Sequence, residues 1–319
     1  RRCRHDDQEQ GLFSLAVRLL SAPHLRRPNV ARFLGIMDRI TVPEIVSAED
    51  VRFYIDNGYL VVENLISDDE IREICGDLPR LIRNDYDANG NFPEITGNES
   101  DAELLQKVLC IRHAHFVSPV IEKYVRHEKI AGVLSQITTA HLPYWDGSVK
   151  CMQSMFFAKP AGSPGSPWHQ DELYIPTRDR SLVGAWIAVD DATLENGCLW
   201  VIPGSHRQGR LYDQRDHNNP GEFDSGQESF GFDDAGAVPV KVARGSVVFF
   251  NGYLLHRSRK NNSANYRRVL VSHYMNAWSL LPWPDLAGHM DNRKIMLVAG
   301  IDPYAHKGTG ENCRTIGFR

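Results

Sequence analysis

The spacing of apolar and polar residues divides the chain into two parts with different periods. In residues 47–137, apolar side chains recur every three or four positions, as in helices that bury one face. In residues 151–275, they form short runs of strand length, separated by glycine, proline and asparagine. The pattern therefore predicts mainly helices in the first part and mainly strands in the second.

The first part contains clear helix boundaries. Ser47-Ala48-Glu49-Asp50 resembles a capping box, and Gly58 stands where a helix C-cap belongs, so a short helix is expected between them. Residues 59–62 then read as a strand. A second capped helix is expected over 67–80, and one further helical stretch over 118–137. These helices are expected to cover one sheet of the second part.

The second part predicts an all-β core. Asn196-Gly197 is a strong hairpin signal between two of its runs. The expected fold is mainly β with flanking helices: a double-stranded β-helix, or jelly roll, at about 145–278, with the site in its mouth. A single domain is expected over 37–319. The strand-like runs are residues 151–158, 182–189, 198–202, 239–242, 246–250 and 269–275.

Residues 1–36 look unlike the rest. The segment does not begin with methionine, and Arg18 interrupts its apolar stretch. Acidic residues near its start are also wrong for an import signal. We expect Met37 to be the natural start and residues 1–36 to be a non-native or poorly ordered extension.

The composition narrows the class of protein. A content of 42% hydrophobic and 24% charged residues is ordinary for a globular enzyme, and a net charge of -4 argues against nucleic-acid binding. No apolar run approaches the roughly 18 residues that span a bilayer. The six cysteines lack Cys-x-x-Cys spacing, which predicts free thiols in a reducing, cytoplasmic setting. A small-molecule substrate is expected; nothing indicates an oligomeric state.

Trp168-His169-Gln170-Asp171 carries the first candidate chemistry. In an extended segment His169 and Asp171 point the same way, whereas Gln170 points elsewhere. A third ligand is expected from His256, at the end of a buried strand that follows the turn Asn251-Gly252. Two histidines and one carboxylate bind one face of a ferrous ion and leave the other face open.

Residues after His256 add a possible anion site. Arg267 opens the run that leads into 269–275, and a guanidinium can clamp a carboxylate through paired hydrogen bonds. Ser258 shares the face of His256, although a surface hydroxyl is an equal alternative. Trp186 reads first as a core aromatic residue. In a chain with 13 histidines a single His-x-Asp means little, but its combination with His256 and Arg267 is specific.

These residues resemble the phytanoyl-CoA dioxygenase family of iron(II)/2-oxoglutarate-dependent oxygenases. The string Asn196-Gly197-Cys198-Leu199 followed by Pro203-Gly204-Ser205-His206 is the most specific part of the likeness, which extends from about Val51 to Met275. The resemblance implies iron ligands at His169, Asp171 and His256 and a clamp for the distal carboxylate of 2-oxoglutarate at Arg267 and Ser258. It also implies a co-substrate pocket that includes Trp186, Gln170 and Lys107.

The resemblance also implies a reaction. Iron(II), 2-oxoglutarate and O₂ would be required, with ascorbate in support, and 2-oxoglutarate would be decarboxylated to succinate and CO₂ while an unactivated carbon is hydroxylated. Halogenating relatives replace the carboxylate ligand with a small residue, so Asp171 favours hydroxylation. The alternative is a catalytically silent relative that binds metal or 2-oxoglutarate as a sensor or scaffold.

Other features suggest competing or accessory sites. His113 and His115 offer a second pair of imidazoles, as in multi-histidine cupins, but no suitably spaced partners follow them. His206 and His273 are expected to pack or to form hydrogen bonds. Two loops, 162–167 and 207–236, are expected to shape the substrate entrance. Arg178, Arg207 and Arg210 are candidates to meet an anionic substrate, although solvated surface charge is the simpler interpretation.

Overall fold

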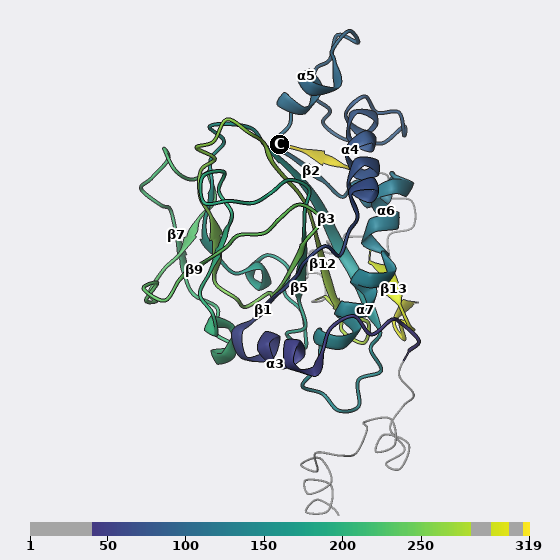
Figure 1. Cartoon of the computed structure of the whole chain (residues 1–319), viewed down its shortest axis with the longest axis vertical. Coiled ribbons are helices and arrows are strands. Elements are labelled where there is room, and N and C mark those ends of the chain that lie inside the picture. The colour runs from purple at the N-terminus through teal and green to yellow at the C-terminus, as the bar shows by residue number, and fades with distance from the viewer. Residues whose placement is uncertain (1–39, 282–294, 306–314) are drawn as a thin grey trace, which may run out of the picture.

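A computed structural model describes residues 40–281, 295–305 and 315–319. Within these residues the chain forms two antiparallel sheets that pack against each other (Figure 1). This arrangement confirms the predicted jelly-roll class. The expectations for residues 1–36 and for Met37 fall outside the described residues. No helix in the described ranges is both long and apolar enough to cross a bilayer.

The larger sheet, called here the major sheet, has eight strands. Its two longest strands, β3 and β12, lie side by side in its centre and pair over nearly their whole length. In spatial order the strands are β1 (Tyr59–Val62), β10 (Val247–Asn251), β5 (Val183–Ala188), β12 (Arg267–Asn276), β3 (Val149–Lys159), β2 (Cys110–Arg112) and β14 (Gly317–Phe318), with β13 (Met296–Ala299) also paired to β3.

The smaller sheet, called here the minor sheet, has four short strands. A separate two-stranded ribbon lies within the segment predicted to be a long loop. The minor sheet has the order β4 (Ser166–His169), β11 (His256–Ser258), β6 (Leu199–Val201) and β9 (Val238–Val240), and the ribbon joins β7 (Gln214–Arg215) to β8 (Glu228–Ser229).

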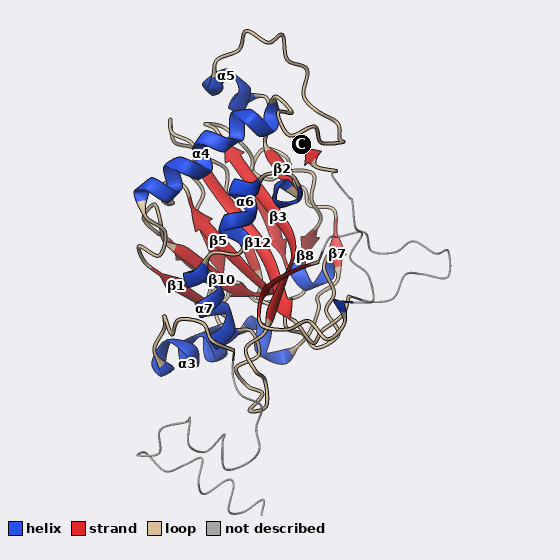
Figure 2. Cartoon of the chain, turned by 90° about the vertical axis from the view of Figure 1, so that its right-hand side faces the viewer, coloured by secondary structure: helices blue, strands red, loops and turns tan. Residues whose placement is uncertain are grey.

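Helices cover the outer face of the major sheet (Figure 2). Ser47 and Ser67 form complete capping boxes, and Gly58 ends the first helix with φ 81°, as predicted. The helices are α3 (Ala48–Asn57), α4 (Asp68–Ile82), α5 (Asp101–Gln106), α6 (Pro119–Val125) and α7 (Glu128–Ile137), with short 3₁₀ turns η1 (Ala114–Phe116), η2 (Asp171–Leu173) and η3 (Ser205–Gln208).

The helical stretch predicted over 118–137 is confirmed, but it is divided into two helices, α6 and α7. The chain leaves helical geometry at Arg126 and His127, where His127 has φ -55° and ψ 129°. Tertiary partners hold this break: the ring of His127 lies 2.9 Å from a carboxylate oxygen of Glu70 on α4, and Arg126 donates to the carbonyl of Leu297. Hydrophobic periodicity does not register such distant contacts.

Asn196-Gly197 forms a turn, but the predicted hairpin is wrong. Strand β5 before the turn belongs to the major sheet, whereas β6 after it belongs to the minor sheet. The Asn196 side chain satisfies the turn internally by donating to the Asp191 carbonyl and accepting from the Thr193 N–H. Gly197 has φ 82°, and a Cβ there would lie 2.2 Å from the Arg259 carbonyl oxygen. The turn therefore serves a crossing between sheets.

Alternation along the strands of the major sheet creates two cores. Outward-facing residues such as Phe249 and Leu270 pack with the apolar face of α4. Inward-facing residues such as Trp186 and Val248 pack with Val201 of the minor sheet. The helices thus stabilise the major sheet from outside and leave its inner face to form the walls of a cavity.

Candidate active site

The pairing of β4 with β11 brings two histidines together. His169, the last residue of β4, lies directly opposite His256, the first residue of β11, and their ring centroids are 4.1 Å apart. Close approach of the backbones depends on Gly165, where a Cβ would lie 2.1 Å from the Ser258 carbonyl oxygen. Strand register therefore places two imidazoles from distant parts of the chain at one edge of the minor sheet.

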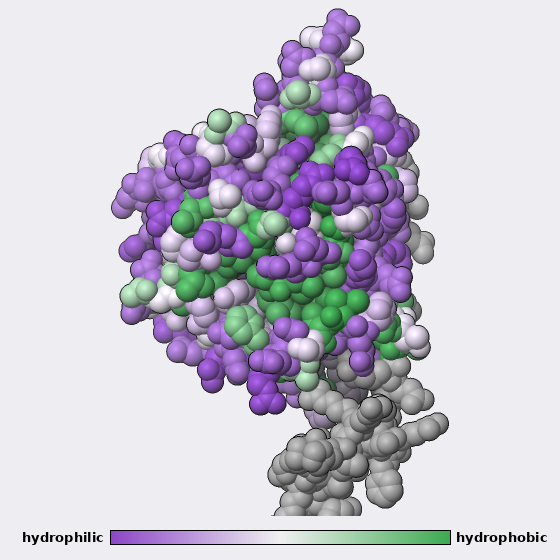
Figure 3. Space-filling view, in the orientation of Figure 1, coloured by the Kyte–Doolittle hydropathy of each residue, from purple (hydrophilic) through white to green (hydrophobic). Residues whose placement is uncertain are grey.

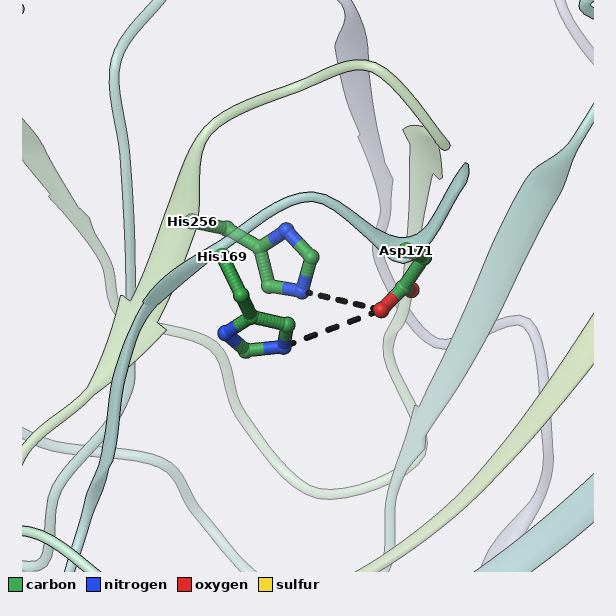
Figure 4. A group of neighbouring side chains, drawn as sticks. All are labelled: His169, Asp171 and His256. Atoms are coloured by element: carbon green, nitrogen blue, oxygen red, sulfur yellow. Dashed lines mark ion pairs between the residues drawn. The ribbon is translucent and has the colours of Figure 1, made fainter. Parts of the chain in front are cut away.

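Asp171 completes this group (Figure 4). Gln170 is extended and Asp171 begins the turn η2, so the carboxylate reaches the same space as His169. The Oδ1 atom of Asp171 lies 3.7 Å from the Nε2 atoms of both His169 and His256. No other set of three histidine, cysteine or acidic side chains converges in this way within the described ranges.

The remaining polar atoms of these side chains have partners. Nδ1 of His169 lies 2.7 Å from the Pro167 carbonyl oxygen, and Nδ1 of His256 lies 2.9 Å from the Leu254 carbonyl oxygen. Because a carbonyl only accepts, both Nδ1 atoms carry the proton and both Nε2 lone pairs face inward. Two neutral imidazoles and one carboxylate are a donor set that suits ferrous iron.

His273 orients the carboxylate from the major sheet. Its Nε2 lies 2.8 Å from Oδ2 of Asp171, so Oδ1 remains directed at the two imidazoles. Burial raises the pKa of Asp171, but the charges that His256 and His273 carry when protonated in acid outweigh burial and hold the pKa below its usual range. Burial, reinforced by the charge of His169, lowers the pKa of His256 to about 4. These shifts favour the protonation states that bind a metal ion.

The structure corrects the strand expected before His256. Residues 252–254 form a turn, and His256 begins β11 instead of ending a strand. Asn251 closes this turn, since its side chain accepts from the Tyr253 N–H and its carbonyl accepts from the Leu254 N–H. The turn places the Leu254 carbonyl under the imidazole of His256.

A cavity of about 80 Å³ adjoins the three side chains and is bounded by both sheets. Because a single water needs roughly 10–15 Å³ by this measure, the cavity has room for a small organic molecule. Its lining contains apolar side chains and three basic ones, Lys159, Arg257 and Arg267. The lining residues are Met155, Phe157, Lys159, Ser166, His169, Asp171, Trp186, Leu199, Phe250, His256, Arg257, Ser258, Arg267, Val271 and His273.

Arg267 begins β12 as predicted and contributes one of the basic groups. The residue is only 3% exposed, and its guanidinium carbon lies 5.6 Å from the centroid of the Trp186 ring. Its Nε is buried with no hydrogen-bond partner among the described residues. Burial lowers the pKa of Arg267 to about 10, so the group remains charged at neutral pH.

The sequence and fold have clear relatives. The family model for phytanoyl-CoA dioxygenase (PhyH) matches residues 54–269. A phytanoyl-CoA dioxygenase from Arabidopsis thaliana is 30% identical over 72% of this chain and 88% of its own length. The chain belongs to the phytanoyl-CoA dioxygenase family. It is therefore a non-haem iron(II)/2-oxoglutarate-dependent dioxygenase.

One further sequence relative and one solved structure are also similar to this chain. A protein from Bos taurus named peroxisomal phytanoyl-CoA dioxygenase is 29% identical over 73% of this chain and 69% of its own length. The crystal structure of the non-haem α-ketoglutarate-dependent carbocyclase SnoK superimposes with a TM-score of 0.57 at 22% identity, covering 78% of this chain and 92% of that one. The second likeness shows a shared fold.

Two residues expected in the co-substrate pocket of this dioxygenase lie elsewhere. Gln170 is fully buried, and its amide group donates to the carbonyls of Arg210 and Tyr253 and accepts from the Tyr212 N–H. Lys107 caps α5 and bonds to Glu99 and a backbone carbonyl. Neither residue lines the cavity. An extended backbone turns Gln170 away from His169, and α5 lies apart from the sheet that forms the cavity wall.

The accessory candidates also have defined places. His115 bonds to Ser154 and belongs to no convergent group of ligands, which disfavours a second metal site among the described residues. His206 bonds to the Ile55 carbonyl, and His273 bonds to Asp171, so both form the predicted hydrogen bonds. Arg210 lies over the Tyr212 ring, 4.6 Å from its centroid.

Lys159 was missed at the sequence level. It ends β3 on the same face as Met155 and Phe157, and its ammonium lies 3.1 Å from Oγ of Ser258. Ser258 also accepts from the Ser166 N–H, so this hydroxyl joins the two sheets. Alternation along β3 was a usable signal, because it places a lysine on the same face as Met155 and Phe157.

Proposed function

We propose that this dioxygenase hydroxylates an unactivated carbon of a small organic substrate. The observation that supports the proposal is the convergence of His169, Asp171 and His256 beside a partly apolar cavity with buried cations. Bound iron(II) supplies the activation of O₂, coupled to the decarboxylation of 2-oxoglutarate to succinate and CO₂.

The proposed roles follow from the contacts. His169, Asp171 and His256 hold the metal ion, with the imidazole tautomers set by the Pro167 and Leu254 carbonyls. The buried guanidinium of Arg267 and the hydroxyl of Ser258 hold the distal carboxylate of 2-oxoglutarate. Trp186 forms a wall beside that guanidinium.

The carboxylate of Asp171 favours hydroxylation over halogenation. The carboxylate occupies the third ligand position, and His273 bonds to its second oxygen. A halide ligand would need that position to be vacated by a smaller side chain. The hydrogen bond from His273 and the lowered pKa of Asp171 instead favour an ionised carboxylate.

The apolar part of the lining supports an organic substrate. Phe157, Phe250 and Val271 exclude water from the space next to the ligands. Apolar residues also gather in the middle of the face seen in Figure 3, inside a hydrophilic surround. The substrate is therefore proposed to present a hydrocarbon portion to the metal.

Purified protein tests the proposal. With iron(II), ascorbate and 2-oxoglutarate, the wild type is expected to release succinate slowly even without substrate, and a metabolite panel should reveal a compound that accelerates release and gains one oxygen atom. His169→Ala and Asp171→Ala should abolish release, whereas exposed His141→Ala serves as the matched control. If the wild-type protein binds iron but releases succinate only at the background level, the alternative of a catalytically silent relative is favoured.

We further propose a reducing compartment such as the cytoplasm. Cys75, Cys110, Cys151 and Cys198 are all free thiols in the described part of the chain. The bovine relative carries a peroxisomal name, so fractionation of cells expressing the tagged protein is the direct test.

A further inference from the structure

Two basic side chains lie next to each other on the inner face of the major sheet. Lys159, the last residue of β3, pairs across the strands with Arg267, the first residue of β12. Each is 3% exposed, and both line the cavity. Cross-strand neighbours on one face have their Cβ atoms about 5 Å apart, so the two charges act on one region.

This pair lacks a compensating carboxylate. Among the described residues, no acidic side chain lies within ion-pair distance of Lys159 or Arg267. Asp224 is the acid whose charge acts on Lys159, but it pairs with Arg319 at 3.0 Å and accepts from Ser166. Buried like charges are costly unless an anion joins them.

The ammonium of Lys159 is held ready for a ligand. Its protein contact is Oγ of Ser258 at 3.1 Å, and that hydroxyl stands on the strand that carries His256. Burial, together with the charge of Arg267, lowers the pKa of Lys159 well below its usual value. An incoming carboxylate would reverse this destabilisation of the charged form.

We infer that Lys159 is a second cationic binding residue for the distal carboxylate of 2-oxoglutarate, acting with Arg267 and Ser258. The inference rests on the proposed function, because it assigns a further residue to the same co-substrate site. It also gives Lys159 a part in specificity: a 2-oxo acid without a distal carboxylate gains nothing from the ammonium. If Lys159 only positions Ser258, Lys159→Met should have no further effect in a Ser258→Ala background, whereas general damage to the pocket should weaken the binding of both kinds of acid equally.

Calorimetric titration without oxygen distinguishes a binding role of Lys159 from a purely structural one. Protein loaded with redox-inert Zn(II) is titrated with 2-oxoglutarate and with 2-oxovalerate, which has the same carbon chain but no distal carboxylate. Lys159→Met should weaken 2-oxoglutarate binding roughly 10- to 100-fold, the range of one charge-assisted hydrogen bond, and leave 2-oxovalerate unchanged. Lys159→Arg should recover part of the loss, and Zn(II) affinity should match the wild type.

Two results would overturn the inference. One is a 2-oxoglutarate affinity that Lys159→Met leaves unaltered, either in the wild type or in a Ser258→Ala background; the other is equal weakening of both acids. If the methionine variant does not fold, Lys159→Gln is titrated in the same way and judged by the same two criteria. Failure of the Zn(II)-loaded wild type to bind 2-oxoglutarate would instead reject the proposed function, and this inference with it.

Discussion

The major and minor sheets contribute different side chains to the dioxygenase site. Strands β3 and β12 of the major sheet span Val149–Lys159 and Arg267–Asn276, pack under helices on one face and deliver Lys159, Arg267 and His273 to the cavity on the other. The minor sheet has strands of three or four residues, yet it carries His169 and His256 at their ends.

This difference shows how stability and chemistry are divided. Long ladders with two buried faces supply most of the apolar burial and hold the buried cationic side chains rigidly. Short strands end where ligands are needed, so their terminal side chains project into the cavity. Changes in the minor sheet should therefore affect function more than stability, and changes in the outer layer of the major sheet should do the reverse.

The sharpest test removes a minor-sheet ligand. His256→Ala should lower succinate release by more than about 1000-fold, because two remaining ligands hold a metal poorly. Its unfolding free energy in urea should stay within about 1 kcal/mol of the metal-free wild type. A variant that keeps its bound iron and its activity would contradict the assignment; His141→Ala again serves as the control.

The converse test removes an outer-layer residue of the major sheet. Phe249 is fully buried on β10 within the core shared with α4. Phe249→Ala should cost about 3–5 kcal/mol of unfolding free energy through lost burial and a residual cavity. Urea denaturation measures this cost, with half-exposed Leu194→Ala as the control. The metal affinity of the folded variant should be unchanged. A large loss of that affinity would contradict the division of stability and chemistry between the two sheets.

His273 is the expected exception within the major sheet. Its Nε2 lies 2.8 Å from Oδ2 of Asp171, so His273→Ala should weaken metal binding by about 10- to 100-fold. Titration with Zn(II) gives the affinity, and His273→Gln, which retains a donor, should recover part of it. Affinity equal to wild type would mean that Asp171 holds its orientation without this partner.

The smallest effect is expected from a substitution in the helices that cover the major sheet. Burial raises the pKa of Glu70, but hydrogen bonds from Ser67 and His127 outweigh it and lower the pKa to about 2. Since the folded pKa lies below the unfolded one, the stabilisation is present above about pH 4.5 and is lost as pH falls toward 2. Glu70→Gln should cost about 1 kcal/mol at pH 7.

Urea denaturation at two pH values checks this sign. The difference between wild type and Glu70→Gln should shrink at pH 3 relative to pH 7. A difference that grows in acid would show that the carboxylate is not stabilised in its ionised form. Succinate release by the variant should equal wild type, because α4 contacts the outer face of the sheet.

Sequence patterns predicted elements and ligand types well where the determinants are local. Ser47 and Ser67 cap their helices through atoms three residues away, and alternation alone turns Gln170 away from His169. The prediction was incomplete or wrong where distant partners decide: His127 divides a helical stretch through Glu70, and Asn196-Gly197 joins strands of different sheets.

The chain by itself determined the inventory of this site: two histidines, an aspartate and an arginine, of which His256 and Arg267 lie next to runs of strand-forming residues. Only the tertiary structure decided which of them meet. The pairing of His169 with His256, and of Lys159 with Arg267, depends on strand register. Register is selected by the packing of the whole core, because a shift of one residue would turn every side chain to the opposite face.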